Sequence, residues 1–343
     1  MSEDIFTNLM LRTLDDHIKA KRAEGLTDTE ILERINKIDF TEFFSEMTET
    51  MATDTVDTLE KTMYERVLEE RAQTAEFMAR HEQIWGKGFV ASEAMYIMVL
   101  ETVDMYRQYV DSLPTQLIEG KQYHLAALRQ IHARACQQFL EITYLIKAGF
   151  ADGAFARWRS MYELSVVADF LKNNDESVSL AFIESADSDD SWHNWAKAAP
   201  CFAGHKGNIT FNDIQNKCDF STDDWKRQYK LANKIVHASP QGTMYRLGAF
   251  VDTGVLQAGH SDYGVSLAAE HSAISLAVIT ASFLTILPYG DGAVNASTIG
   301  KWVDIVRKYY FEAEDRCFTK NNEMHATKID GTVINTNNAR NRE

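Results

Sequence analysis

The residues of this sequence best suited to chemistry are five polar side chains on two predicted helices. Arg159 and Glu163 are four residues apart, and Tyr229, Asn233 and His237 follow one another at the same spacing. Side chains four residues apart share one face of an α-helix, so each group forms one polar patch. Histidine titrates near physiological pH and can serve as an acid, a base or a ligand. The two patches are therefore the candidate functional site.

Each patch also has a structural interpretation. The helix around Arg159 and Glu163 is otherwise apolar, so the pair must either find partners in the core or border a cleft. A buried ion pair that sets the register of two helices and a functional cleft pair both satisfy this condition. Tyr229, Asn233 and His237 fit either a site or a structural hydrogen-bond ladder. Under both interpretations we expect the two patches to face each other across one helix–helix contact.

Other sequence motifs argue against several classes of enzyme. Cys201, His205 and Cys218, with His193 nearby, do not have the spacing of a structural zinc site. The sequence at His81, HEQIW, lacks the second histidine of a zinc hydrolase helix. The chain contains no GxxxxGK[ST] loop, no GxGxxG motif and no GxSxG motif. We therefore predict no metal and no cofactor, and most ATPase, Rossmann and α/β-hydrolase assignments are disfavoured.

The elements that position these residues are predicted to be helices. Proline occurs only four times in the chain, which favours long helices because proline disrupts them internally. Apolar spacing predicts an all-α protein, a multi-helix bundle, with helices at 91–113, 123–147, 151–172, 221–238, 263–287 and 298–318. Gly86 and Gly88 are predicted to break a helix, and Gly149 to end one in a short helical hairpin turn. Residues 173–221 are predicted to be irregular with short helices, and 241–262 a loop. No segment alternates strongly enough to require a strand.

Three regions are predicted along the chain. Residues 1–75 form an acidic N-terminal helical extension, in which Thr27 to Glu30 resemble a helix start. Its stripe of apolar residues predicts a packed or oligomerising helix and consists of Phe43, Phe44, Met47, Met51, Val56, Leu59, Met63, Val67 and Leu68. Residues 76–318 form the main helical domain. Residues 319–343 are predicted to be a disordered polar tail.

Composition limits the partners and the compartment. The net charge of −15 disfavours broad nucleic-acid binding, although a small local RNA site remains compatible with it. Four scattered cysteines indicate reduced thiols and a cytoplasmic protein. The N-terminus does not resemble a secretory signal. The longest apolar stretch, 273–288, has about 16 residues, fewer than the roughly 20 that a membrane span needs, so no membrane association is expected.

Three segments of the chain resemble one protein family. Residues 145–171 read LIKAGFADGAFARWRSMYELSVVADFL and are similar to a helical hairpin of the DUF5677 group of uncharacterised bacterial proteins. Residues 229–243, YKLANKIVHASPQGT, resemble a later helix of that group, and residues 259–273, GHSDYGVSLAAEHSA, its following turn and core helix. The resemblance extends from about Phe77, where FMARHEQIWGKGF begins, to Leu287.

The DUF5677 group in turn resembles the HEPN helical superfamily, many of whose members are metal-independent ribonucleases, while others are non-catalytic. This resemblance implies a HEPN-like core and a homodimer. In an active site of this type, His237 would act as acid or base. Arg159 or Lys230 would stabilise charge on the phosphate. Glu163 would orient Arg159, and Asn233 would hold the histidine or the phosphate, with Tyr229 as a further binding residue. The arginine of the HEPN motif falls on Ala232, so the sequence departs from the motif there.

Two functions follow from these observations. The first is a non-catalytic interaction or sensing module in a stress or phage-defence context, which the acidic surface and Ala232 favour. The alternative is a HEPN-like ribonuclease, a toxin-type effector that uses His237 and Arg159, which the grouping of polar residues favours. Whether the protein is an enzyme stays open at this point.

Overall fold

The computed structural model describes residues 5–37, 40–188, 192–237, 239–244, 246–248, 258–318, 326–327 and 333–334. Most of these residues form α-helices and short 3-10 helices, and turns connect them. Two strands of two residues each, β1 (Ala326–Thr327) and β2 (Val333–Ile334), pair in antiparallel orientation. The predicted all-α multi-helix fold is confirmed. Apart from this strand pair, the predicted disordered tail lies outside the described residues.

The chain divides into two compact units, Met1–Thr74 and Ala75–Glu343. The first unit contains α1 (Ile5–Ala23), α2 (Asp28–Ile35) and the beginning of α3 (Phe40–Ser112). Thr27 caps α2, because its hydroxyl accepts from the Glu30 amide while its own amide donates to the Glu30 carboxylate at 2.8 Å. The predicted helix start at Thr27 is therefore confirmed.

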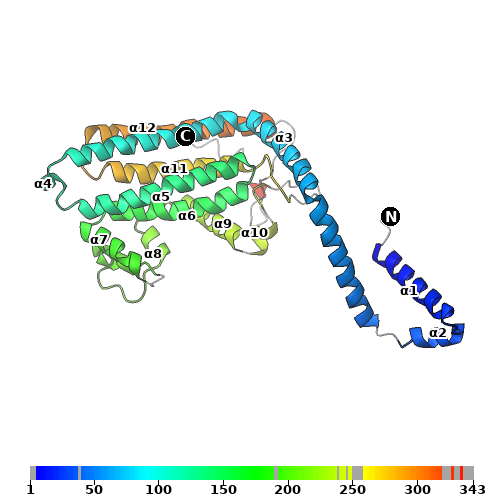
Figure 1. The fold of residues 1–343 in the computed structure, drawn as a ribbon. Helices are drawn as coiled ribbons and strands as arrows, with labels where there is room; N and C mark the ends of the chain where they lie inside the picture. Colours follow the sequence, from blue (N-terminus) through cyan, green and yellow to red (C-terminus); the bar gives the residue numbers. More distant parts are fainter. Residues whose placement is uncertain are drawn as a thin grey trace. The chain divides into compact units, whose positions relative to one another are not determined.

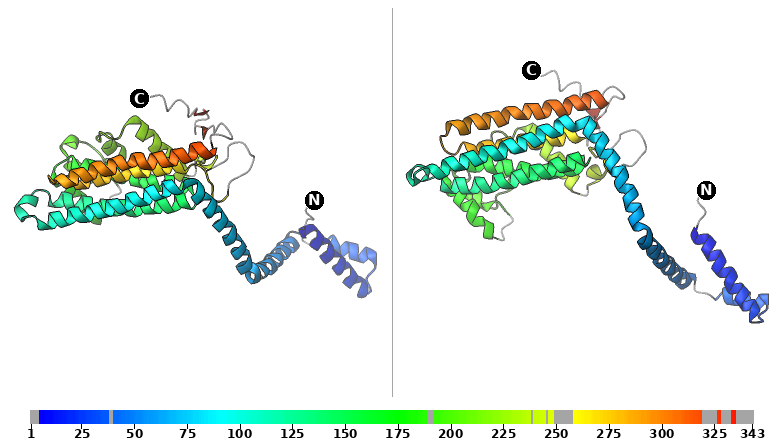
Figure 2. Two further views of the ribbon diagram at one scale, coloured as in Figure 1. Left: turned by 90° about the horizontal axis from the view of Figure 1, so that it is seen from above. Right: turned by 45° about the horizontal axis from the view of Figure 1, so that its top comes forward.

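The second unit is a bundle of long helices that lie side by side (Figure 1). It contains the rest of α3, α5 (Gln122–Lys147), α6 (Ala151–Lys172), α11 (Val265–Leu284) and α12 (Gly290–Phe318). Two further views show the same grouping (Figure 2). The shorter elements are α4 (Thr115–Ile118), α7 (Glu176–Glu184), η1 (Ser185–Asp187), η2 (Asn194–Ala198), η3 (Pro200–Phe202), α8 (Phe211–Gln215), α9 (Asp223–Val236) and α10 (Pro240–Met244).

Helix α11 lies at the centre of this bundle and contacts α5, α6 and α12. It is long and apolar enough to cross a membrane by length and composition alone, but 67% of its apolar window is buried inside the protein. A core helix passes the same test, and some of the polar side chains of α11 bond to neighbouring helices of the bundle. Trp158 on α6, for example, is fully buried and donates to the Ser275 hydroxyl of α11 at 3.0 Å.

The hairpin that carries Arg159 and Glu163 forms as predicted. Helix α5 ends at Lys147, and Gly149 follows with a φ of +76°. Its amide donates to the Ile146 carbonyl, and the Phe150 amide donates to the Leu145 carbonyl at 2.8 Å, so the last carbonyls of α5 are satisfied. Glycine is required here because this backbone conformation is unfavourable for other residues.

The predicted helix break at Gly86 and Gly88 is wrong, because α3 continues through both glycines to Ser112. A glycine inside a helix costs only about 1 kcal/mol relative to alanine. The neighbours Trp85 and Phe89 are each 1% exposed, and their burial offsets this cost. A Cβ at Gly88 would lie 2.9 Å from the Tyr310 ring, so glycine here permits close packing of α12 against α3.

Candidate functional site

The candidate site lies where α9 packs against α6. Helix α9 is mostly polar, and among its described residues only Ala232 is fully buried. Its contact with α6 is extended by aromatic side chains. The Trp225 ring stacks on Tyr162 with centroids 5.8 Å apart and an interplanar angle of 8°. The Tyr229 ring lies 5.4 Å from Tyr162. These contacts hold the polar face of α9 against the α6 turn that carries Arg159 and Glu163.

Four of the predicted site residues form one hydrogen-bonded group, here called the polar cluster: Arg159, Glu163, Tyr229 and Asn233. The guanidinium of Arg159 donates from Nε to the Asn233 side-chain oxygen. From Nη2 it donates to the Tyr229 hydroxyl at 3.3 Å and lies 3.0 Å from the Glu163 carboxylate. The Tyr229 hydroxyl donates to the same carboxylate at 2.6 Å. The two patches therefore do face each other across one helix–helix contact.

The electrostatics of the cluster keep Tyr229 protonated. Burial raises the pKa of Tyr229 above its ordinary value, and the neighbouring Glu163 carboxylate raises it further. The positive charge of Arg159 acts in the opposite direction but does not outweigh them. The side chains of Arg159 and Glu163 remain 28% and 30% exposed. The cluster thus borders solvent and is not an ion pair sealed in the core.

His237 does not join the polar cluster. Helix α9 ends at Val236, and His237 is its C-cap residue with extended backbone angles, φ −88° and ψ 145°. The helix ends here because Pro240 begins α10, and the Ser239 hydroxyl caps that helix by accepting from the Gly242 amide at 3.0 Å. The His237 side chain is exposed, and within the described part of the chain it forms no hydrogen bond or ion pair.

Lys230 is also outside the cluster. Its side chain is exposed on α9 and makes no ion pair with any described residue. The cation of the cluster is therefore Arg159 alone among the predicted site residues. The set Cys201, His205 and Cys218 likewise does not form a metal site, since the described residues contain no group of three metal-ligating side chains.

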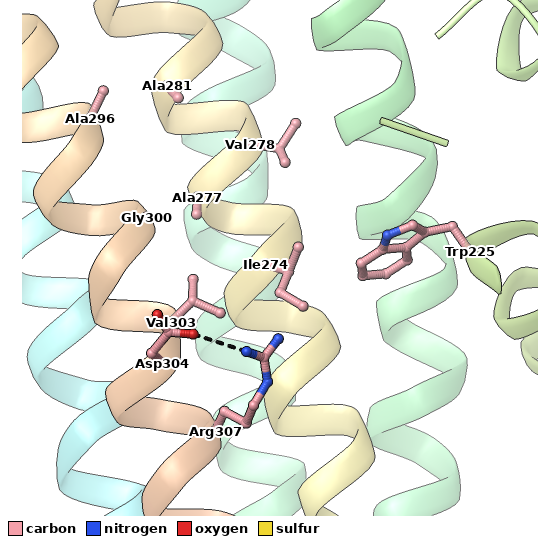
Figure 3. Close-up of a pocket in the computed structure, with 10 residues that line it drawn as sticks. All are labelled: Trp225, Ile274, Ala277, Val278, Ala281, Ala296, Gly300, Val303, Asp304 and Arg307. Atoms are coloured by element: carbon pink, nitrogen blue, oxygen red, sulfur yellow. Dashed lines mark hydrogen bonds and ion pairs between the residues drawn. The ribbon is translucent and has the colours of Figure 1, made fainter. Parts of the chain in front are cut away.

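A shallow groove of about 520 Å³ is lined by α11, α12 and the Trp225 side chain of α9 (Figure 3). Its walls are small or apolar residues, and one end holds an ion pair between Asp304 and Arg307 at 2.9 Å. Glu270 also accepts from Arg307 at 2.5 Å, so this arginine is paired with two carboxylates of the protein. The groove is mostly apolar, whereas the polar cluster gathers several charged and hydrogen-bonding side chains, which makes the polar cluster the stronger candidate site.

Sequence reasoning missed a second polar group, centred on His81 in α3. This histidine is fully buried, with Nδ1 2.7 Å from the Asp262 carboxylate and Nε2 2.9 Å from the Ile146 carbonyl. Both ring nitrogens therefore lie within hydrogen-bonding distance of an oxygen, one on the Asp262 side chain and one on the backbone of α5. Burial alone would raise the pKa of Asp262, but the hydrogen bond from His81 and the charge of Arg80 outweigh it and lower that pKa.

The spacing of α3 contained a signal for this group. Phe77, His81, Trp85 and Phe89 follow one another at four-residue intervals, and all four are buried. A histidine within such a stripe needs a polar partner, although nothing local identifies Asp262 as that partner. Through the buried His81 ring, this group joins α3 to the end of α5 and to the segment that holds Asp262.

The polar cluster can position an anion or hold α9, and His237, the residue predicted to act as acid or base, lies outside it. Its arginine is engaged by three side chains of the protein itself. This arrangement favours an ordered helix contact, while the exposure of Arg159 leaves one edge open to solvent.

Comparison with known proteins gives one match. No curated protein and no solved structure matches the chain. A family model described as a family of unknown function, DUF5677, matches residues 125–198. This segment covers α5, α6 and the short helices that follow, and it includes Arg159 and Glu163 but not α9. This part of the chain is therefore similar to the DUF5677 family.

Proposed function

We propose that this protein is a non-catalytic helical module for interaction or sensing, in which α9 is a separate element fastened to the bundle by the polar cluster. One observation carries the proposal: the Arg159 guanidinium binds Asn233, Tyr229 and Glu163 of its own chain. An arginine with three protein partners is poorly placed to clamp a phosphate, because those bonds must first be broken.

The sensing role follows from how α9 is attached. Its only fully buried described residue is Ala232, and other apolar side chains such as Trp225 and Tyr229 are only partly buried against the bundle. The cluster therefore adds to this packing in holding α9. An anion or an acidic partner that reached the exposed edge of Arg159 would compete with Glu163 and loosen α9. The setting we propose, from the family resemblance, is a stress or phage-defence system of the bacterial cytoplasm.

The test compares Glu163→Gln with a matched control. Glu141→Gln removes the same charge from a carboxylate that pairs with the other α6 arginine, Arg157, away from α9. We expect amide hydrogen exchange to accelerate in α9 for Glu163→Gln and to stay unchanged there for Glu141→Gln. Equal exchange in the two variants would contradict the role of the cluster as the fastening of α9.

The alternative function is a HEPN-like ribonuclease, and the exposure of both Arg159 and His237 favours it. Purified protein would then cleave RNA without metal and leave 2′,3′-cyclic phosphate ends. His237→Ala would abolish that cleavage without changing the melting temperature. Under the non-catalytic proposal, wild-type protein and His237→Ala show the same background cleavage. Metal-independent cleavage that depends on His237 would therefore overturn the non-catalytic proposal.

A further inference from the structure

In the first unit, α3 carries an apolar stripe that this unit leaves uncovered. Val56 and Met63 are 62% and 58% exposed, and Tyr64 and Val67 are 70% and 46% exposed. Helices of globular proteins normally bury such a stripe, and contiguous exposed apolar surface marks an interaction site. The uncovered stripe therefore calls for a partner.

The same unit has almost no core of its own. Among its described side chains, the buried apolar residues are Ile31 and Met47. A unit of this size with so little buried apolar surface commonly gains stability by association. The question is which partner fits the stripe.

The sequence of the stripe is symmetric in a way that identifies the partner. Residues 60–71 read EKTMYERVLEER. About the midpoint between Glu65 and Arg66, apolar residues mirror apolar residues and charged residues mirror charges of opposite sign, except that Thr62 mirrors Glu69. The mirrored pairs are Met63 and Leu68, Tyr64 and Val67, Glu60 and Arg71, Lys61 and Glu70, and Glu65 and Arg66. Two copies of this helix placed antiparallel bring each residue level with its mirror residue.

Helix geometry decides which of these pairs can meet. At about 100° per residue, Glu60 and Arg71 are three turns apart and point within roughly 20° of each other. Tyr64 and Val67 lie between them, about 30° to either side. In an antiparallel pair, Glu60 of one copy meets Arg71 of the second copy, and the twofold axis repeats this contact. In a parallel pair, Glu60 would instead face Glu60.

We propose that two copies of this chain associate through this face of α3, in antiparallel orientation, with Tyr64 and Val67 at the centre and Glu60–Arg71 ion pairs at both ends. Both charged residues are exposed, and neither pairs with a described residue of its own chain. Six large apolar side chains of this segment are 44–70% exposed: Val56, Leu59, Met63, Tyr64, Val67 and Leu68. At on the order of 100 Å² each, they offer roughly 600 Å² per copy. Charged side-chain stems bring this near the roughly 800 Å² per partner of a stable complex.

The test is a charge reversal and its rescue, read by analytical ultracentrifugation of the full chain over a range of concentrations. The wild type is expected to dimerise. E60R places two arginines together at each end and should raise the dimer Kd about tenfold or more. The double variant E60R/R71E restores opposite charges and should return Kd to near the wild-type value. Circular dichroism of each variant verifies that helicity is retained.

The matched control is E69R, which makes the same charge change on the opposite side of the helix and should leave Kd unchanged. A second variant, Tyr64→Ala with Val67→Ala, should weaken association by removing the apolar centre. A monomeric wild type would overturn the proposal. So would equal Kd values for E60R and E69R, or a double variant that associates no better than E60R. These outcomes do not depend on whether the polar cluster is catalytic.

Discussion

Replacing Tyr229 with phenylalanine tests the polar cluster most directly. The substitution removes one hydroxyl that donates to Glu163 at 2.6 Å and accepts from Arg159 at 3.3 Å, and it leaves the ring contacts in place. Hydrogen bonds to charged groups contribute about 1.5–3 kcal/mol each. Arg159 and Glu163 are partly exposed, and their own ion pair at 3.0 Å remains in the variant. We therefore expect the free energy of unfolding to fall by an amount near the lower end of this range, about 1.5 kcal/mol.

The assay is urea denaturation followed by circular dichroism, with Tyr144→Phe as the control. Tyr144 is 63% exposed and forms no hydrogen bond with a described residue, so its replacement should change stability by less than about 0.5 kcal/mol. The pKa of Tyr229 is raised from its ordinary value of 10.0, so its stabilisation is complete below pH 10 and is lost at higher pH. The difference between wild type and Tyr229→Phe should shrink correspondingly in alkali. If Tyr229→Phe and Tyr144→Phe have equal unfolding free energies at pH 7, the reasoning is refuted.

Three further predictions concern the core and the turn. Burial lowers the pKa of His132 and of His271 from 6.5 to about 4. The unfolded chain then binds protons that the folded chain does not, and each histidine should cost about 3 kcal/mol of stability as pH falls from 6.5 to 4. A urea midpoint that stays constant across this range would contradict it. Gly149→Ala should destabilise by about 2 kcal/mol more than Gly204→Ala in urea denaturation, because both have positive φ but only the first would clash with a neighbouring ring. Asp262→Asn should cost roughly 3–5 kcal/mol at pH 7, because it leaves a buried histidine without its carboxylate. Since the pKa of Asp262 is lowered, that difference should hold above pH 4 and vanish at lower pH, as thermal melts across pH can establish.

Most helices of the second unit could be predicted from sequence because their signals are local. The hairpin helices were expected at 123–147 and 151–172, and the structure has them at Gln122–Lys147 and Ala151–Lys172. The turn glycine, Gly149, also has the positive φ that its place after a helix predicts. Errors arose where packing outweighed local preference, as at Gly86 and Gly88, where α3 continues through two residues that weaken a helix.

The candidate site was predictable only in part. Four-residue spacing correctly grouped Arg159 with Glu163 and Tyr229 with Asn233, because side-chain position on a helix repeats almost every four residues. It could not indicate that α9 ends before His237, since the cap of α10 sets that end. Nor could it indicate that Arg159 would be engaged by its own chain.

By itself, the sequence determined that this chain is a helical protein with a polar group on each of two helix faces and an apolar stripe on a third helix. These properties depend on residues within a few turns of one another. Only the tertiary structure decided which polar groups meet: Arg159 binds Asn233 across 74 residues, and His81 binds Asp262 across 181. The physical reason is that such contacts form only when burial of apolar surface elsewhere has brought the helices together.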